Sequence, residues 1–379
     1  MKFLIFEPCS SGHHLEYIRH QLTFASTSND FFVFVLALGL AQGLVEFQPL
    51  IKRDNIKIIY LSDIDSNIIN NSSVIQRGIK LCTILRKYQK LVNAEKIILN
   101  EIILFMPFLP LYINGFDIIR GIVYKIPRYR GKRSTLTQLK DNLIYRIFSL
   151  SKVIEYVWLL NANTAIDYYN KRFHTLKFKF LPDPINVTGS LNENILSKYK
   201  KTPKIILVHG GGMGARKGTF EIIDAVKSLP FEYYDKFVLI FAGKISNDKE
   251  NDRLKKFIEE YSSKIEIEYS DRFIPFEDLC SYILVSDYVL IPYKNVEQSS
   301  GILGYAAYFN KYVIGPAEGL LGDLIKRYNL GITLENIDSK QIRNLLQVLQ
   351  KTKQKINKNA IEYVNLNNVK KFTDMIFKK

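Results

Sequence analysis

Short apolar runs and amphipathic stretches alternate along almost the whole of this 379-residue chain, and this alternation limits the possible folds more than any other feature. Runs such as 2–7, 31–36 and 237–242 are rich in aromatic and β-branched side chains, which is typical of buried strands. Between such runs lie segments such as 74–92, with apolar residues at helical spacing. Strands that alternate with helices favour a parallel, doubly wound sheet. We therefore predict an α/β protein.

Two such alternating series follow one another along the chain, whose length is that of about two to three domains. We expect a first Rossmann-like domain over residues 1–185 and a second over residues 186–360. The boundary lies near a proline-containing segment, Leu181–Pro184. Residues 361–379 are expected to form a C-terminal helix that is placed to cross back to the first domain.

The composition limits the binding partners and the cellular compartment that can be expected for this protein. A formal net charge of +16 indicates an anionic partner, such as a phosphorylated ligand, an anionic membrane or nucleic acid. Three scattered cysteines, Cys9, Cys82 and Cys280, make neither a disulfide framework nor a metal cluster, and they suit a reducing cytoplasm. The longest apolar stretch, 97–113, is interrupted by a carboxylate and two prolines, so it falls short of the ~20 residues that span a bilayer. We expect a cytoplasmic protein and leave open peripheral attachment to the inner membrane face.

Residues 285–315 predict a strand, a polar loop, a helix and a second strand in direct succession. The helix begins at Ser299, Ser300 and Gly301, so its free N–H groups point to the carboxyl end of the sheet, where phosphate binds. Glu297 precedes the helix, and a carboxylate there would accept hydrogen bonds from hydroxyls and repel phosphate. Phosphate and hydroxyls together indicate a sugar nucleotide. The alternative stays open that Ser299 only caps the helix and that Glu297 is a solvated charge.

A glycine-rich loop, His209 to Gly218, joins another predicted strand to a helix. Gly211 and Gly212 allow the backbone to approach a ligand closely, and Arg216 and Lys217 are placed to neutralise phosphate. The loop has neither the Gly-Lys-Ser/Thr of a Walker loop nor a regular dinucleotide fingerprint. A mobile loop with two solvated charges is the alternative.

The first loop of the chain, residues 8–17, occupies the same kind of position in the first domain. Gly12 permits close approach to a ligand, and His13 or His14 could hydrogen-bond a sugar or take a proton. A structural or solvated histidine is the alternative.

Between residues 119 and 134 the chain has basic residues and no acidic one. Such a segment suits anionic lipid head groups or a phosphorylated acceptor. Aromatic residues between the basic ones could also stack on RNA bases, but no nucleic-acid module accompanies them, so we rank RNA lower. A solvated loop is the alternative. The residues expected to contact acceptor or membrane are Arg120, Lys125, Arg128 and Arg130.

Four segments carry a resemblance to a known family. They are Leu181–Pro184, Arg216–Gly218, Arg272–Leu279 with the following Ser286-Asp287, and Glu297–Lys311. Together they resemble the donor domain of retaining glycosyltransferases of family 4. The resemblance extends over about residues 180–335 and is weak before that. It implies the GT-B fold, in which two Rossmann-like, doubly wound parallel-sheet domains face a central cleft.

The resemblance also implies roles for individual residues. Glu297 would contact the hydroxyls of the transferred sugar, and Lys217 would neutralise the leaving diphosphate. His13 joins these two as the candidate catalytic residue of the first domain. The residues expected to bind the donor or its nucleotide are Gly12, Gly211, Gly212, Arg216, Ile274, Ser299, Ser300, Gly301 and Tyr305. A UDP- or GDP-linked sugar would be the co-substrate, with no further cofactor, and we expect no metal.

This chain departs from the family pattern in the donor half. Tyr305 stands where the signature has its second glutamate, and Gly210 and Gly211 stand where an arginine commonly opens the glycine loop. No residue matches the acceptor-side histidine, and Arg120 lies in roughly that region. We expect a retaining, metal-independent hexosyltransferase that acts on a lipid-linked or polysaccharide acceptor in cell-surface glycan synthesis. The alternatives are a non-catalytic GT-B protein that binds a partner or nucleotide, and a basic RNA-binding protein.

Overall fold

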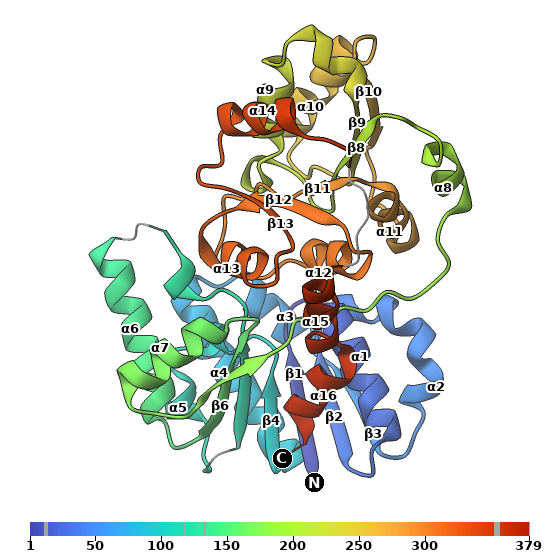
Figure 1. The fold of residues 1–379 in the computed structure, drawn as a ribbon. Helices are drawn as coiled ribbons and strands as arrows, with labels where there is room; N and C mark the ends of the chain where they lie inside the picture. The colour runs from blue at the N-terminus through green and yellow to red at the C-terminus, as the bar shows by residue number, and fades with distance from the viewer. Residues whose placement is uncertain (11–13, 117, 132–133, 352–356, 379) are drawn as a thin grey trace. The chain divides into compact units, whose positions relative to one another are not determined.

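The computed structural model describes residues 1–10, 14–116, 118–131, 134–351 and 357–378. The chain forms two compact units. Unit 1 comprises residues 1–126, 132–182 and 369–379, and unit 2 comprises residues 127–131 and 183–368. Each unit is built on one parallel sheet with helices packed against it (Figure 1). The predicted α/β class with two doubly wound sheets is confirmed.

The sheet of unit 1 has the strand order β3-β2-β1-β4-β5-β6-β7, and every neighbouring pair is parallel. The chain order reverses between β1 and β4, so the loops that follow these two strands flank a crevice at the carboxyl edge of the sheet. The strands are β1 (Lys2–Glu7), β2 (Phe31–Leu36), β3 (Ile56–Tyr60), β4 (Lys96–Leu99), β5 (Ile119–Val123), β6 (Ile154–Leu160) and β7 (Phe178–Leu181).

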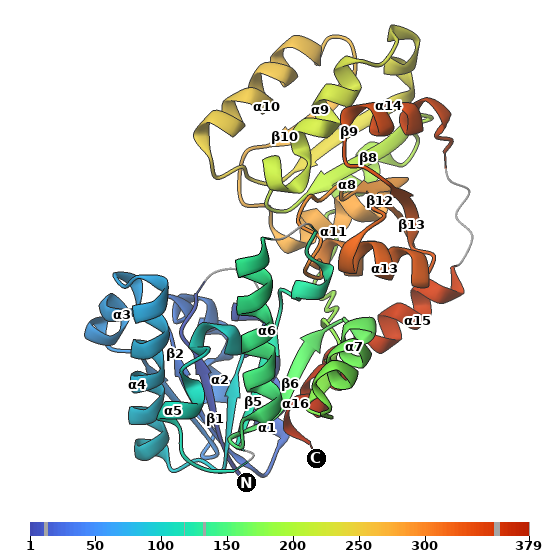
Figure 2. The ribbon, with the colours of Figure 1, turned by 90° about the vertical axis from the view of Figure 1, so that its left-hand side faces the viewer.

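The helices of unit 1 include one from the far end of the chain. In α16 the ring of Phe377 packs edge-on against Phe3 and Phe32 and stacks on Phe24, so residues near both termini share one core. Figure 2 shows α16 in red among the blue and green elements of unit 1. The helices are α1 (His14–Thr27), α2 (Gln48–Ile51), α3 (Asp63–Asn70), α4 (Val74–Val92), α5 (Leu109–Tyr112), α6 (Thr135–Leu150), α7 (Asn163–Phe173) and α16 (Val369–Phe377).

The sheet of unit 2 has the order β10-β9-β8-β11-β12-β13, again with parallel neighbours. Its chain order reverses between β8 and β11, which places the loops after these strands at the crevice where ligands bind in open α/β sheets. The strands are β8 (Ile205–Gly210), β9 (Phe237–Ala242), β10 (Glu266–Ser270), β11 (Tyr288–Leu290), β12 (Tyr312–Pro316) and β13 (Gly331–Leu334).

Apolar clusters on both faces of this sheet are covered by helices. In the described part of the chain, no helix is both long and apolar enough to cross a bilayer. The helices of unit 2 are α8 (Glu193–Tyr199), α9 (Thr219–Lys227), α10 (Asp248–Tyr261), α11 (Phe276–Val285), α12 (Gly301–Tyr308), α13 (Gly319–Arg327), α14 (Ser339–Val348) and α15 (Lys358–Leu366).

The C-terminal segment forms two helices, α15 in unit 2 and α16 in unit 1, where we expected one. The break is at Asn367, which is fully buried. Its side-chain oxygen accepts the N–H of Asp183 at 3.0 Å, and its carbonyl accepts the N–H of Ile185 at 2.6 Å. These contacts hold the segment that leaves unit 1 against the segment that returns to it. In a continuous helix the backbone carbonyl of Asn367 would instead accept the N–H four residues later.

Candidate functional site

The glycine loop after β8 lies directly on the loop after β9. The N–H of Gly211 bonds to the carbonyl of Ala242 at 2.9 Å, and Met213 bonds in the same way to Lys244 at 3.1 Å. At Gly243 a Cβ atom would lie 1.9 Å from the carbonyl oxygen of Gly211, so only glycine allows the two loops to come this close. At Gly212, by contrast, a Cβ would meet nothing within 4 Å. The loop therefore presents bare backbone to open space at this point.

That open space is a pocket of about 340 Å³, within the range of small-molecule sites. The rings of Phe276 and Tyr305 meet edge to face at 5.2 Å, and both residues line this pocket together with glycine backbone. A lining of glycine backbone and aromatic rings suits a flat ring with a polar rim. The lining residues are Gly211, Gly212, Gly243, Lys244, Ser246, Phe273, Ile274, Phe276, Leu279 and Tyr305. Four of the predicted nucleotide contacts thus line one pocket.

Lys217 ends the glycine loop, in a short 3-10 turn at Ala215–Lys217. Its Nζ lies over the ring of Tyr293, 3.5 Å from the centroid. Burial, aided by the positive charge of Arg216, lowers the pKa of Lys217 to about 7, and no carboxylate of the described residues offsets this. A partly buried ammonium group without a counter-ion favours the binding of an anion.

The N-terminus of α12 reaches the same tyrosine. Ser300 is the N-cap residue and is buried, and its side chain makes no capping bond to the helix. Ser300 lies near the Tyr293 side chain, whose hydroxyl is buried without a hydrogen-bond partner among the described residues. Burial raises the pKa of Tyr293 to about 12, while Ser300 and Arg216 act in the opposite direction. Lys217 and Ser300, both predicted phosphate contacts, therefore meet on one side chain, with the free N–H groups of a helix beside them.

Glu297 is buried, and its Oε2 accepts a charged hydrogen bond from Nε of Arg130. Arg130 belongs to residues 127–131, the short segment from the first half of the sequence that forms part of unit 2. We expected Arg130 to contact an acceptor or a membrane. The structure instead pairs this arginine with the carboxylate that we expected to contact the transferred sugar.

His209 is a buried polar residue beside the glycine loop whose role in holding the loop was not expected from the sequence. It is buried at the end of β8, and burial lowers its pKa to about 4, so the ring is neutral. Nδ1 donates to the carbonyl of Leu290 at 2.9 Å, which leaves Nε2 to accept from Thr219 Oγ1 at 2.9 Å. Thr219 Oγ1 in turn accepts the N–H of Gly214 at 2.8 Å. The histidine thus joins β8, β11 and the glycine loop. Its position at the end of an apolar run was the available signal.

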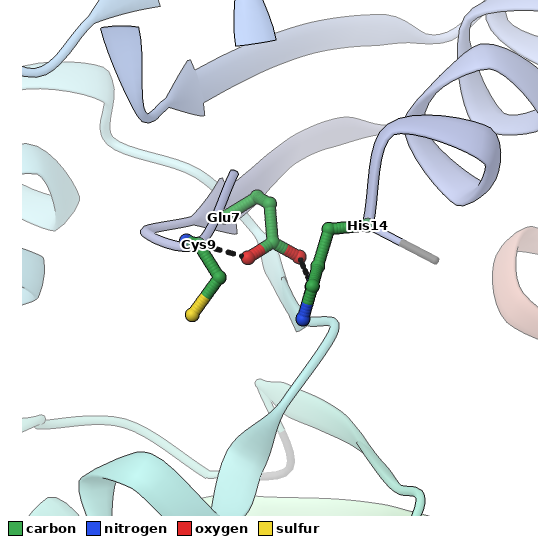
Figure 3. Close-up of side chains that lie close together, drawn as sticks. All are labelled: Glu7, Cys9 and His14. Carbon is green, nitrogen blue, oxygen red and sulfur yellow. Dashed lines mark hydrogen bonds and ion pairs between the residues drawn. The ribbon is translucent and has the colours of Figure 1, made fainter. Parts of the chain in front are cut away.

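In unit 1, the residues at the end of β1 form a second polar cluster (Figure 3). Glu7 is fully buried; its Oε1 accepts the N–H of Cys9 at 2.9 Å, and its Oε2 accepts from His14 Nδ1 at 2.8 Å. His14 Nε2 lies 3.7 Å from Glu101, which follows β4. Burial acts to lower the pKa of His14, but the bond to Glu7 and the charges of Glu7 and Glu101 raise it overall. The predicted loop is therefore part of a charged cluster at the switch point of unit 1.

The ligand atoms of Glu7, Cys9 and His14 all lie within 4.8 Å of one another, so these three side chains could hold a metal ion. Both oxygens of Glu7 already accept hydrogen bonds from the other two residues. Burial raises the pKa of the Cys9 thiol to about 12, which disfavours the thiolate that binds metals. Gly12 and His13, for which we expected donor contact and a catalytic role, lie outside the described residues.

The basic residues between positions 119 and 134 have different environments in the structure. Arg120 is 2% exposed and is part of the core of unit 1. It bonds to Glu155 at 2.8 and 3.2 Å and to the carbonyl of Ile376 at 2.8 Å, so it ties β5 to β6 and α16 and cannot meet an acceptor or a membrane. Lys125 and Arg128 are exposed. Lys125 also lies close enough to Glu101 to oppose the effect of burial, which raises the pKa of that carboxyl.

No protein-family model matches the chain, and no curated protein matches it by sequence. Solved structures do match over nearly the full length. The UDP complex of HepE from Anabaena has 13% identity, covers 99% of this chain and 98% of its own, and has a TM-score of 0.68. Sucrose-phosphate synthase from Thermosynechococcus elongatus has 13% identity, covers 99% and 97%, and has a TM-score of 0.74. WaaG, a glycosyltransferase of lipopolysaccharide biosynthesis, has 13% identity, full coverage of both chains and a TM-score of 0.65.

The chain has the GT-B fold. The expected architecture of two parallel-sheet, Rossmann-like domains is thereby confirmed. At these identities the similarity establishes architecture, and the chemistry has to be argued from the residues of this chain.

Proposed function

We propose that this protein is a glycosyltransferase that takes a sugar from a nucleoside-diphosphate sugar. The observation that carries the proposal is the convergence in unit 2 of the glycine-lined pocket, the unpaired Lys217 ammonium and the N-terminus of α12. A base in the pocket and a diphosphate between Lys217 and Ser300 use all three features. Structures of similar fold that hold UDP support this choice.

Each residue then has a physical role. Departure of the nucleoside diphosphate increases the negative charge on its terminal phosphate, and Lys217, Arg216 and the helix N–H groups stabilise that charge when it is largest. Ser299, Ser300 and Gly301 supply the donors at the helix start, and Ile274 and Tyr305 contact the base or ribose. Glu297 accepts hydrogen bonds from sugar hydroxyls, with Arg130 fixing its orientation. His13 is the candidate from unit 1.

The finer parts of the proposal rest on the family resemblance. They are retention at the anomeric carbon, a UDP- or GDP-linked hexose as donor, and catalysis without a metal or cofactor. The acceptor we propose is a lipid-linked or polysaccharide chain, in cell-surface glycan synthesis at the cytoplasmic face of the membrane. The exposed Lys125 and Arg128 support an anionic acceptor or membrane surface.

A thermal-shift panel tests the donor class, because a ligand that binds only the native state raises the melting temperature. UDP, GDP, ADP and their common sugars would be compared at saturating concentration, with wild type beside Lys217→Met. We expect one base to raise Tm in wild type, and the shift to be mostly lost in the variant. No shift with any nucleotide would contradict the proposal.

A non-catalytic nucleotide-binding protein is the second candidate, and the ion pair at Glu297 favours it, since a paired carboxylate is less available to a sugar. The two candidates differ in turnover. Binding of a nucleotide without release of nucleoside diphosphate from any nucleotide sugar, with or without acceptor, would select the non-catalytic reading.

A further inference from the structure

Helix α6 of unit 1 has two apolar faces, and only one of them is used by the fold. Ile144, Tyr145 and Phe148 are buried in unit 1. On the other face four leucines lie in solvent, with exposed fractions of 79, 60, 55 and 69% for Leu136, Leu139, Leu143 and Leu150. Helix α6 lies at the surface of unit 1, in contact with α7 (Figure 2). An exposed apolar face of this extent requires an explanation.

The four leucines form a stripe along the helix. At about 100° per residue, they and the half-buried Ile147 fall within an arc of about 80°, and the stripe runs for about 20 Å. Lys140 lies on one edge of this arc and Arg146 on the other, each displaced by about 20°. The exposed side of α6 is therefore an apolar stripe between two positive edges, which we call the leucine stripe.

The charged side chains that α6 itself places beside the leucine stripe are all positive. Among the described residues, neither Lys140 nor Arg146 takes part in an ion pair, and both are exposed. Asp141 is the only acidic residue of the helix, and helical geometry places it on the opposite side. Lys152, two residues beyond the helix, adds a further positive charge and lies over the exposed ring of Phe116.

We propose that the leucine stripe is a docking surface for an anionic lipid bilayer, with α6 lying in the plane of the interface. In a helix that lies in the membrane plane, apolar side chains enter the acyl boundary, and the basic side chains on either side of them stay at the head groups. Lys140 and Arg146, one on each edge, face the anionic head groups on both sides of the buried leucines.

Two other occupants fit the stripe less well. Two copies packed stripe to stripe would set positive edges against positive edges, which like-charge repulsion disfavours. RNA binds through basic and aromatic side chains, and the stripe itself is aliphatic. A lipid surface satisfies both the apolar centre and the positive edges.

Co-sedimentation of the full chain with vesicles tests the proposal and needs no donor or acceptor. Vesicles of phosphatidylcholine with about one third phosphatidylglycerol would be compared with pure phosphatidylcholine. The variants are Leu139→Asn/Leu143→Asn in the stripe and Lys140→Gln/Arg146→Gln at its edges. The matched control is Leu91→Asn/Leu176→Asn, which changes two exposed leucines of unit 1 outside α6.

We expect wild type and the control to bind the anionic vesicles equally. The leucine variant should bind at least about tenfold more weakly than wild type. The charge variant should bind anionic vesicles about fivefold more weakly for each charge removed, with no change on neutral vesicles. All of these side chains are exposed, so an unchanged Tm and circular dichroism spectrum should accompany the losses. Nucleotide binding should be the same in every variant, which separates this test from that of the proposed activity.

Wild type that stays in the supernatant, or a leucine variant that binds like wild type, would overturn the proposal. RNA binding that is lost in the charge variant but not in the leucine variant, without vesicle binding, would assign the surface to nucleic acid. A dimer that dissociates in the leucine variant, without vesicle binding, would make the stripe a self-association surface.

Discussion

Lys217 is the residue on which the proposed chemistry depends most. Its pKa is lowered to about 7 because the ammonium group is buried beside Arg216 without a carboxylate partner. Above pH 7 the free protein therefore loses this charge, while a bound diphosphate would restore it. Binding of the nucleotide should take up a proton between pH 7 and pH 10.

This predicts a pH dependence of nucleotide affinity. Phosphate groups are fully ionised above pH ~7, so the affinity of wild type for the nucleoside diphosphate should fall as pH rises to 9, by up to about tenfold per unit. Isothermal titration calorimetry at several pH values would measure this slope. It should be absent in Lys217→Met. The control Lys294→Met removes a neighbouring exposed lysine that pairs with Glu221 at 2.6 Å, and it should keep the wild-type slope. Equal slopes in wild type and Lys217→Met would contradict this role.

The pH dependence of folding stability has the opposite sign to that of nucleotide affinity. The folded-state pKa of Lys217 lies below its ordinary value of 10.5, so between pH 7 and 10.5 the unfolded chain binds more protons than the native one. This group therefore makes native unit 2 more stable as pH rises through that window. Denaturant titrations of wild type and Lys217→Met at two pH values would detect the difference.

The ion pair between Arg130 and Glu297 should couple the two residues energetically. Removing one partner leaves a mostly buried charge without its hydrogen bond, which destabilises the fold. Removing both partners leaves no buried charge unpaired. For a pair that is partly open to solvent we expect a coupling free energy of about 1 kcal/mol between Arg130→Gln and Glu297→Gln. A double-mutant cycle in urea measures it. Strictly additive losses would mean that the pair is incidental.

At the scale of elements, the glycine loop offers a matched pair of substitutions. In Gly218→Ala the new Cβ would lie 2.1 Å from the carbonyl oxygen of Pro292, at a φ of +74°. We expect a loss of about 2 kcal/mol and a Tm lower by about 4–8 °C. Gly212→Ala, with nothing within 4 Å, should leave Tm unchanged.

The same loop position separates binding from stability. Gly212→Leu should keep the wild-type Tm yet weaken nucleotide binding, because its side chain would enter the pocket. A loss of Tm comparable to that of Gly218→Ala, or unchanged affinity, would show that Gly212 does not face the ligand.

Most elements could be predicted because their apolar pattern is local. The bounds of β1, β2, β9 and α4 agree with the sequence, since each is a continuous run with one period. The edge strand β13 and the helices α3, α8 and α13 were missed. Strand β13 has only four residues, one of them glycine, and its place is fixed by the ladder with β12, which no local pattern reveals.

The site could be predicted only in part, because some of its contacts join residues that are distant in the sequence. The glycine loop and the start of α12 carry their own signals in neighbouring residues. The contact of Arg130 with Glu297 joins residues 167 apart in sequence, and that of Asp183 with Asn367 joins residues 184 apart. Neither could be read from local pattern, so Arg130 was assigned to a surface and 361–379 to one helix.

At the scale of the whole molecule, the last helix completes the core of the first unit. Phe377 is 2% exposed and contacts three phenylalanines of unit 1. Phe377→Ala should therefore lower the free energy of unfolding of unit 1 by about 3–5 kcal/mol. Met375→Ala, at a half-exposed position of the same helix, is the control and should cost far less. Denaturant unfolding followed at unit 1 would measure both, and equal small losses would mean that α16 contributes little to that core.

The central claim is that Lys217 and the start of α12 hold the diphosphate of an activated sugar. Release of nucleoside diphosphate from a panel of UDP- and GDP-sugars, with membrane extract as acceptor source, tests it most directly. The account predicts that wild type releases nucleoside diphosphate from at least one donor, and that Lys217→Met does so at least about a hundredfold more slowly. Equal rates in wild type and Lys217→Met, or no release and no nucleotide binding by a folded wild-type protein, would contradict it.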